Sequence, residues 1–347
     1  MEFPNPSDHK RYHSLYHYNK TRYGARVMKA SLDAGCTCPN RDGTRGHGGC
    51  TFCQGLSHYF AGSGDIAGQL ERETKRIHGK YPTAKIIAYF QAGTNTYGPL
   101  TELERGWQTA LGDREVCGLS IATRCDCLEE PVLDALSRLN EQTDLTVELG
   151  LQTIHDKTAE RIHRGHSFEE FLTGYRALHK RGIRTCVHLI NGLPGETRED
   201  MLESARVLGQ LRPGGVKIHL LHVTRDTELA EAWRRGDYIP MEKQDYIDIT
   251  AAQIRLFPPE TVMERLTGDG DRRYLLAPLW SRDKSPCWGA STTGCGCGTR
   301  CRGISFKKQS EVSFFAVFGM RDFCYLTGLF WTRYNNSIIL TQEGEET

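Results

Sequence analysis

The chain has 347 residues, of which 25% are charged and 38% hydrophobic, and its formal net charge is +1 at pH 7. This composition describes a globular protein in water, either one large α/β domain with an appendage or two ordinary domains. No apolar run approaches the ~20 residues of a membrane-spanning helix, and the start of the sequence lacks a basic and then apolar targeting signal. We therefore expect a cytoplasmic protein without a membrane partner. The near-zero net charge argues neither for nor against nucleic acid.

The N-terminal segment, residues 1–24, mixes basic and aromatic side chains, and two interpretations are open. Such side chains can follow a phosphate backbone and stack on unpaired bases. They can also belong to an ordinary helix with a solvated basic face, which is the interpretation we favour. The side chains concerned are Lys10, Arg11, Tyr12, His13, Tyr16, His17, Tyr18, Lys20, Arg22 and Tyr23.

A predicted strand at 25–32 leads into a glycine-rich loop with four cysteines. Disulfide bonds are rare in the cytoplasm, so clustered thiolates indicate a site for zinc or for an iron–sulfur cluster. A zinc site would use all four thiolates, whereas a cluster held by three leaves one iron open. The glycines let the backbone wrap closely around a bulky group, which favours a cluster. The four cysteines are Cys36, Cys38, Cys50 and Cys53.

Two cysteines separated by one residue rarely point both sulfur atoms at the same centre, so we expect either Cys36 or Cys38 to be a bystander. Cys38 precedes the turn-forming Pro39 and is the expected ligand. Cys36 closes an apolar segment and is expected in the core. The predicted metal ligands are therefore Cys38, Cys50 and Cys53.

Beyond this loop, apolar strands alternate with amphipathic helices. Strands are predicted at 25–32, 84–90, 116–122, 145–151, 184–190 and 216–221, and helices at 66–80, 103–111, 129–139, 156–162, 168–180 and 197–211. This alternation indicates parallel βαβ units with right-handed crossovers. About six such units in residues 25–235, with an extension at 236–284, form either an open doubly wound sheet or an incomplete barrel.

In both architectures the carboxyl ends of the strands share one rim, and polar residues gather there. Each has an alternative role as a cap or turn residue, but their coincidence on one rim favours a functional site. No P-loop occurs, and no G-x-G-x-x-G joins a strand to a helix, so an ordinary nucleotide site is unsupported. The rim residues are 91–97, 123–127, Glu148, Gln152, His155, 191–196, His219, His222 and Arg225.

Several motifs together resemble one family. Cys38-x11-Cys50-x2-Cys53, with the insert 39–43, is similar to the YhcC/YtqA-type radical S-adenosylmethionine (SAM) proteins, relatives of the elongator catalytic subunit. Matching motifs also lie at 89–97, 148–153, 164–166 and 192–197. The resemblance runs from about Tyr12 to Lys284, although the cysteine spacing departs from the commonest radical SAM pattern.

The resemblance implies an α/β fold, a partial (β/α)6 TIM-like barrel, that holds a [4Fe-4S] cluster on the three predicted cysteines. In such proteins the open iron chelates the amino and carboxylate groups of SAM. One electron from the cluster cleaves a carbon–sulfur bond and gives a 5′-deoxyadenosyl radical, which abstracts hydrogen from a substrate. The resemblance also implies a reductant protein, such as flavodoxin or ferredoxin, as a partner.

SAM presents an ammonium group, a ribose diol and an adenine edge, and the rim can match each of them. The superfamily binds the ammonium group after the second strand, where this sequence has neutral side chains in place of the usual glutamate. These side chains are Gln91, Thr94 and Asn95.

Glu148 and Gln152 are predicted to reach the ribose of SAM. For Glu148, an ordinary strand residue paired with a neighbouring Arg or Lys is an equal alternative. The backbone of Asn191, Gly192 and Gly195 is predicted to hold adenine, because glycines permit a close approach.

The rim also carries cationic and proton-transferring side chains that suit an anionic or nucleotide substrate. His188 and His219, in mid-strand, have ordinary core histidines as their alternative. Relatives of the elongator subunit act on wobble uridine in tRNA, so the resemblance points to tRNA modification and to tRNA as a partner. The candidate catalytic residues are Arg124, His166, His222 and Arg225.

A second class of protein stays open. In it the four loop cysteines hold zinc, Cys36 included, and the chain is an RNA-binding module without catalysis. The metal content of the purified protein separates the two classes.

The tail at 285–347 differs from the rest in composition. Its cysteines lie among glycine, arginine and tryptophan and are candidates for a second metal site, but we favour a frameshift near Pro286. Read one nucleotide upstream, the codons can encode an amphipathic segment that resembles the usual end of the family. In that case 314–334 is an exposed apolar stretch rather than a strand pair. Resequencing the gene checks this hypothesis. The tail cysteines are Cys287, Cys295, Cys297 and Cys301.

Overall fold

The computed structural model describes residue 8 and residues 10–55, 63–268, 270–282, 329–334 and 337–342. The chain divides into two units, Met1–Gly296 and Cys297–Thr347. In the second unit β10 (Leu329–Tyr334) pairs antiparallel with β11 (Ser337–Gln342). The tail cysteines and Pro286 lie outside the described residues, so the frameshift stays a hypothesis.

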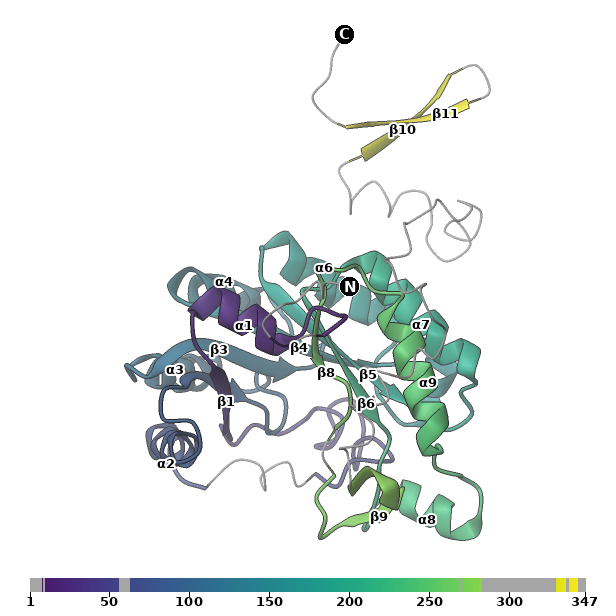
Figure 1. The fold of residues 1–347 in the computed structure, drawn as a ribbon, viewed down its shortest axis with the longest axis horizontal. Helices are drawn as coiled ribbons and strands as arrows, with labels where there is room; N and C mark the ends of the chain where they lie inside the picture. The colour runs from purple at the N-terminus through teal and green to yellow at the C-terminus, as the bar shows by residue number, and fades with distance from the viewer. Residues whose placement is uncertain are drawn as a thin grey trace. The chain divides into compact units, whose positions relative to one another are not determined.

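Seven parallel strands form the sheet of the first unit, in the order β1-β2-β3-β4-β5-β6-β8 (Figure 1). Neighbours in the sheet are also neighbours among its strands in the chain, so the sheet curls in one direction, as in a barrel. Within the described part of the chain, the edge strands β1 and β8 each pair with a single strand of this sheet and not with each other, so the barrel is incomplete. The strands are β1 (Val27–Leu32), β2 (Lys85–Phe90), β3 (Val116–Thr123), β4 (Asp144–Gln152), β5 (Arg184–Asn191), β6 (Gly215–Leu220) and β8 (Val262–Arg265).

Helices cover the outer face of the sheet. Their apolar stripes supply much of the core, for example Leu70 and Ile77 of α2 and Leu133 and Leu136 of α4, all buried. The helices between strands are α2 (Ile66–His78), α3 (Leu100–Leu111), α4 (Glu130–Gln142), α5 (Asp156–Arg161), α6 (Phe168–Lys180), α7 (Arg198–Leu211), α8 (Glu228–Arg235) and α9 (Lys243–Ile254).

The predicted partial barrel and its six strands are confirmed, with ends that differ by one or two residues. The seventh strand, β8, was not predicted because it has four residues and ends in charged Glu264 and Arg265. The small β7 (Val223–Thr224) and β9 (Leu275–Ala277) pair and the 3-10 helix at Leu279–Arg282 were not predicted either. No helix among the described residues is long and apolar enough to cross a membrane.

Helix α1 (Leu15–Tyr23) contacts both edge strands, β1 and β8. The backbone N–H of Met263 in β8 donates to the carbonyl of His13, 2.7 Å away. The N-terminal segment therefore occupies the open side of the barrel.

Two of the aromatic side chains of α1 pack on cations of the barrel. The Arg184 guanidinium lies 4.8 Å from the Tyr18 ring centroid, and Arg26 lies 5.1 Å from that of Tyr16. Such contacts hold the rings in place. The structure therefore favours an ordinary helix over a base-stacking surface here.

Helix α7 begins with a capping box that supports one prediction. The Thr197 hydroxyl accepts from the Asp200 N–H, and the Asp200 carboxylate accepts from the Thr197 N–H at 2.8 Å. Thr197→Ala is expected to lower the free energy of unfolding by about 1 kcal/mol in urea titrations. Thr173→Ala, at an exposed position inside α6, is the control and should cost nothing measurable. Equal losses in the two variants would contradict the capping role.

Candidate metal centre and cofactor site

The cysteine loop lies across the carboxyl ends of the strands. The Thr51 N–H donates to the Ile162 carbonyl at 3.0 Å, and the Leu229 N–H donates to the Thr51 carbonyl at 2.9 Å. These bonds tie the loop to the segment after α5 and to α8. The loop therefore spans the rim that was predicted to carry the site.

The thiols of Cys50 and Cys38 both act on Cys53, and Cys38 also acts on Cys127 of the neighbouring rim loop. The pKa of Cys53 is raised, first by burial and then by the charges of Cys50 and Cys38. The pKa of Cys36 is raised to about 11 by burial and by Asp33. Cys36 thus stands apart from the other three, which supports the predicted ligand set of Cys38, Cys50 and Cys53.

The described cysteines are not arranged around a single ion. A tetrahedral zinc site needs sulfur atoms about 3.8 Å apart, from Zn–S bonds of about 2.3 Å. Among the described residues, the group with three ligand atoms within 4.8 Å of one another is His155, Asp200 and Glu203, without a cysteine. No three sulfur atoms of the described cysteines lie this close together, and a cluster, whose ligand sulfur atoms lie farther apart than those of one ion, does not require it.

N–H donors surround two of the sulfur atoms. Asn40 Nδ2 lies 3.6 Å from Cys50 Sγ, and Arg164 Nη1 lies 3.9 Å from the same atom. Arg41 Nη1 lies 3.9 Å from Cys53 Sγ. Asn40 and Arg164 lie inside the family motifs at 39–43 and 164–166, but their residue types alone predict no role. Their proximity to cysteine is visible only after the rim loops come together.

The loop after β2 packs directly on the cysteine loop. The Thr94 N–H donates to the Thr37 carbonyl at 2.9 Å. A Cβ on Gly93 (φ +71°) would lie 2.0 Å from the Cys36 carbonyl oxygen, so the close approach requires glycine. Gln91, whose N–H donates to the Leu32 carbonyl, begins this loop.

Asn95, in the same loop, is fully buried. Its Nδ2 donates to the carbonyls of Phe90 and Ala122, at 3.2 and 3.1 Å. Its Oδ1 is buried without a protein partner. A buried orphan acceptor is costly, so this atom calls for a donor from a ligand or water.

Glu148 lies at the centre of a buried charge network inside the barrel. Lys29 Nζ donates to Oε1 at 2.6 Å, and Lys217 Nζ donates to Oε2. Tyr89 Oη and His188 Nε2 each donate to Oε2 at 2.8 Å. Burial opposes the charge, but the attraction of Lys217 and Lys29 outweighs it and holds the pKa of Glu148 well below its usual range.

Both carboxylate oxygens of Glu148 are thus engaged by protein groups, and the side chain is 0% exposed. The predicted contact with ribose would have to break one of these bonds. We therefore correct that assignment and adopt its alternative, a strand residue paired with lysine. His188, which bonds Glu148, and His219, whose ring centroid is 5.2 Å from that of His188, belong to the same interior.

A second carboxylate of this network, Glu264, makes stability depend on pH. Burial raises its pKa, but Lys29 and Arg184, 3.1 and 2.8 Å away, outweigh burial and bring it to about 2. The unfolded value is about 4.3. The stabilisation is therefore complete above that value and is lost as pH falls toward 2.

We expect the free energy of unfolding to fall between about pH 5 and about pH 2 in urea titrations. The free energy of unfolding of the Glu264→Gln variant should fall less over the same range, because the variant lacks the titrating carboxyl group. An identical pH dependence in the two proteins would contradict the assignment.

The predicted adenine turn is held by packing. Asn191 and Gln253 exchange amide hydrogen bonds of 2.8 and 2.9 Å. Gly192 (φ +86°) accepts at its carbonyl from Tyr238 Oη, and Gly195 (φ +83°) contacts Arg161. The Asn191 side chain is therefore committed to α9. The carbonyls of Asn191 and Gly192 already accept from the Leu221 N–H and from Tyr238 Oη, so adenine would have to share these backbone groups.

Gln152, at the end of β4, has a φ of +80°. The register between β4 and β5 also shifts between Gly150 and Gln152. Strained backbone of this kind collects at functional sites. The structure therefore retains Gln152 as a candidate for the ribose.

Arg124 is 3% exposed and is already bound. Its Nε and Nη2 donate to Asp126 at 2.8 and 2.7 Å, and its Nη1 donates to the Arg164 carbonyl at 2.9 Å. A guanidinium in this position cannot meet a substrate without leaving its partners. We therefore correct its role from substrate binding to bracing the loop that carries Arg164.

His166 is buried beside this brace and keeps one ring nitrogen for a ligand. Nδ1 lies 3.1 Å from the Ser167 carbonyl, so Nδ1 carries the proton and Nε2 offers a lone pair. Nε2 is buried without a protein partner. Burial, together with Arg164 and Arg124, lowers the pKa of His166 to about 4, so the ring is neutral at pH 7.

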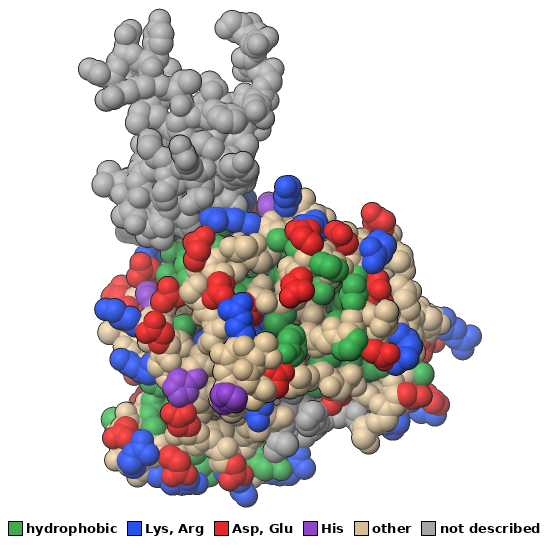
Figure 2. All heavy atoms as spheres, turned by 180° about the vertical axis from the view of Figure 1, so that it is seen from behind, with side chains coloured by type: hydrophobic (Ala, Val, Ile, Leu, Met, Phe, Trp, Pro, Cys, Tyr) green, Lys and Arg blue, Asp and Glu red, His purple; other side chains and the backbone are tan. Residues whose placement is uncertain are grey.

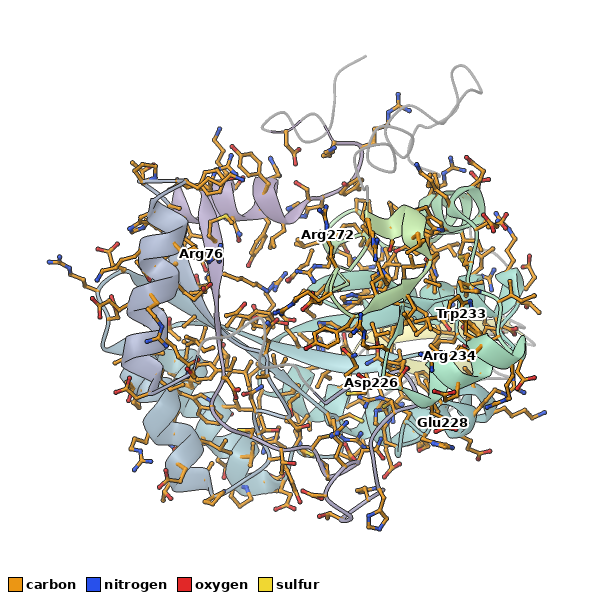
Figure 3. All side chains as sticks on the ribbon, turned by 90° about the horizontal axis from the view of Figure 1, so that it is seen from below. Arg76, Asp226, Glu228, Trp233, Arg234 and Arg272 are labelled. Atoms are coloured by element: carbon orange, nitrogen blue, oxygen red, sulfur yellow. The ribbon has the colours of Figure 1, made fainter. Side chains whose placement is uncertain are left out.

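Arg225 is exposed on the segment between β7 and α8, and its guanidinium lies 5.6 Å from the Tyr274 ring centroid. His222 is half-buried just before β7. Figure 3 shows the neighbouring side chains of this rim segment, Asp226, Glu228, Trp233 and Arg234. The structure thus brings His222 and Arg225 to one segment. The side-chain amide of Gln54, next to Cys53, donates to the Arg225 carbonyl and ties this segment to the cysteine loop.

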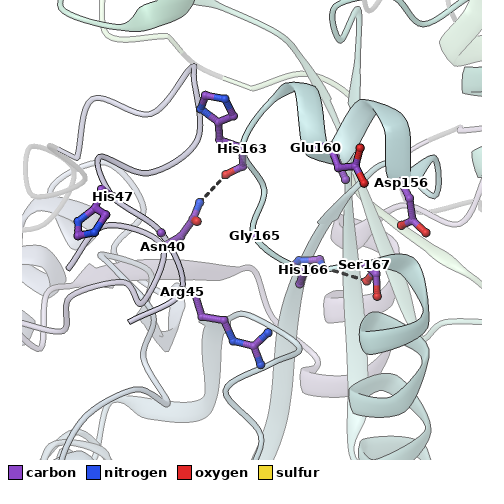
Figure 4. A pocket seen from close by; sticks show the side chains of 11 residues that line it. Asn40, Arg45, His47, Asp156, Glu160, His163, Gly165, His166 and Ser167 are labelled. Carbon is purple, nitrogen blue, oxygen red and sulfur yellow. Dashed lines mark hydrogen bonds between the residues drawn. The ribbon is translucent and has the colours of Figure 1, made fainter. Parts of the chain in front are cut away.

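A pocket of about 580 Å³ opens between the cysteine loop and the segment from α5 to α6 (Figure 4). Asn40 forms part of its wall and is joined to the His163 carbonyl across it. His166 also lines it. Its residues are Asn40, Arg45, Gly46, His47, Asp156, Ala159, Glu160, His163, Gly165, His166 and Ser167.

Comparison with known proteins places these features in a family. The Radical SAM superfamily model matches residues 40–208, and the Radical_SAM C-terminal domain model matches 213–289. YtqA of Bacillus subtilis is 43% identical over 296 residues, which are 83% of this chain and 90% of that protein.

More distant matches share parts of the chain. A tRNA uridine(34) acetyltransferase of Methanocaldococcus jannaschii is 30% identical over 173 residues, 49% of this chain and 31% of that protein. The solved structure of the archaeal Methanocaldococcus infernus Elp3 shares the fold, with a TM-score of 0.61 at 21% identity, over 78% of this chain and 63% of that one. The chain belongs to the YhcC/YtqA-type family of radical SAM proteins and is a radical SAM enzyme.

Proposed function

We propose that the protein holds a [4Fe-4S] cluster on Cys38, Cys50 and Cys53 and cleaves SAM reductively at its open iron. The observation that carries this proposal is the position of the three cysteines on a loop across the barrel rim, with N–H donors beside the sulfur atoms of Cys50 and Cys53. The bound cluster would supply one electron to SAM, which then yields methionine and a 5′-deoxyadenosyl radical.

The protein's own residues would hold and orient SAM. We propose that Asn95 Oδ1, a buried acceptor without a protein partner, accepts from the ammonium group, with Gln91 and Thr94 beside it. Gln152 at the end of β4 would contact the ribose, and the backbone of Asn191, Gly192 and Gly195 would contact adenine. Arg164, next to Cys50 Sγ and with an orphan Nε, would attract the carboxylate.

We propose RNA, and specifically a tRNA wobble uridine, as the substrate. The support is the partial match to a protein named for tRNA uridine(34) and the pocket beside the cysteine loop, which His166 lines. The face in Figure 2 mixes basic and acidic side chains without a broad basic patch, so RNA would have to contact another part of the surface.

Mass spectrometry of tRNA nucleosides from cells with and without the gene tests this substrate. Loss of one modified uridine in the deletion strain, restored by the wild-type gene but not by Cys50→Ala, is the expected result. An unchanged nucleoside profile would contradict an RNA substrate while leaving the cluster and SAM chemistry in place.

We further propose a cytoplasmic location and a small reductant protein, flavodoxin or ferredoxin, as the electron donor. The zinc-bearing RNA-binding module is the competing class. It predicts about one zinc and no iron in protein purified without oxygen, whereas the radical SAM proposal predicts about four irons. The measured metal content decides between them.

A further inference from the structure

The amide of Asn40 has a fixed orientation toward a predicted cluster ligand. Its Nδ2 lies 2.6 Å from the His163 carbonyl oxygen. A carbonyl only accepts hydrogen bonds, so the NH2 end of the amide faces it. The second hydrogen of this nitrogen is available to Cys50 Sγ, 3.6 Å away. The side chain is 3% exposed, so water does not compete for these bonds.

Two glycines leave room for this amide. A Cβ on Gly46 would lie 2.5 Å from Asn40 Oδ1, and a Cβ on Gly165 would lie 2.4 Å from the same atom. Both distances are shorter than real contacts of a Cβ. The two loops thus meet at Asn40 without side chains, and the placement of the amide depends on both glycines.

Cationic donors complete the surroundings of the sulfur atoms. Arg164 Nη1 lies 3.9 Å from Cys50 Sγ, and Arg41 Nη1 lies 3.9 Å from Cys53 Sγ. Each guanidinium is anchored by backbone carbonyls, Arg164 by that of Gly150 and Arg41 by that of Gly48. These backbone anchors therefore fix the direction in which each guanidinium faces its sulfur atom.

Hydrogen bonds to ligand sulfur favour the more negative state of a cluster. Reduction adds one electron, and an N–H directed at sulfur stabilises the added charge, so the reduction potential rises. Asn40 contributes this effect without a net charge, which separates it from the longer-range field of the arginines.

We propose that Asn40, supported by Arg41 and Arg164, is a positioning residue that raises the reduction potential of the cluster through its bond to Cys50. The electron itself comes from the reductant protein or, in the test, from dithionite. This inference rests on the proposed function, because it requires a cluster on Cys38, Cys50 and Cys53.

Redox titration of the reconstituted protein, followed by electron paramagnetic resonance (EPR), tests the proposal. Asn40→Leu keeps the size of the side chain and removes both N–H donors. We expect iron content equal to wild type and a tenfold less favourable one-electron reduction, which is a shift of about 59 mV to lower potential. Gly46→Ala keeps Asn40 but crowds its amide, so its potential should shift in the same direction.

Thr44→Val is the matched control. It lies in the same loop, and its hydroxyl contacts Tyr97 Oη at 2.8 Å rather than a sulfur atom. Its potential should equal that of wild type. A shift as large as that of Asn40→Leu would mean that any change in the loop has this effect, and the proposal would be overturned.

Wild-type potentials in both Asn40→Leu and Gly46→Ala would also overturn the proposal. If Asn40→Leu fails to assemble a cluster, Gly46→Ala decides the question, because it retains the amide. A wild-type protein that takes up no iron under the same conditions is a different result. That outcome rejects the proposed function itself.

Discussion

Cys50→Ala, and equally Cys38→Ala and Cys53→Ala, is expected to remove the iron–sulfur cluster completely. A cluster with one open iron needs three thiolate ligands, so the two cysteines that remain in each variant cannot hold it. Iron and sulfide analysis, with the visible absorbance of protein reconstituted without oxygen, measures the effect. Wild type should bind about four irons per chain.

Cys36→Ala is the matched control in the same loop. Its thiol is grouped with Asp33 rather than with the other cysteines, so the variant should retain the full iron content. Loss of iron in Cys36→Ala would contradict the ligand assignment. It would also restore the arrangement in which all four thiolates bind metal.

Glu148→Gln is expected to cost at least about 3 kcal/mol of the free energy of unfolding, because it leaves Lys29 and Lys217 buried without a full counter-charge. Urea titration at about pH 7 measures the loss. Glu104→Gln is the control, because it removes a surface ion pair in which Glu104 lies 2.8 Å from Arg138. It should lower the free energy of unfolding by less than about 1 kcal/mol.

A loss in Glu148→Gln as small as in the surface control would show that the network tolerates an unpaired lysine. Glu148 would then again be a candidate for the cofactor. The Lys217→Met/Glu148→Leu double variant separates the charge from its burial. It should recover part of the loss, since a well-packed apolar pair can replace a buried ion pair.

The fold could be predicted from the sequence because its signals are local. Six apolar strands separated by amphipathic helices appear in any reading of hydrophobic periodicity, and the family motifs mark the rim loops. Strand β8 was not predicted, because Val262–Arg265 is too short and too charged to resemble a buried strand. Its place in the sheet depends on β6, which lies more than forty residues earlier.

The site was predictable only in part, because long-range contacts decide which polar residues are occupied. Glu148 and Arg124 are residue types that often bind ligands. In the folded barrel, however, Glu148 pairs with Lys217, and Arg124 pairs with Asp126. Asn40 is the opposite case. Its contact with Cys50 requires two glycines from separate loops, and no local pattern in the sequence reports that meeting.

Reductive cleavage of SAM is the central claim, and formation of 5′-deoxyadenosine tests it most directly. Protein reconstituted without oxygen is mixed with SAM and dithionite, and the nucleoside is measured by liquid chromatography and mass spectrometry. We predict 5′-deoxyadenosine from wild type and from Cys36→Ala, and none from Cys50→Ala. A protein with about four irons that forms no 5′-deoxyadenosine, or a colourless protein that holds zinc, would contradict the account.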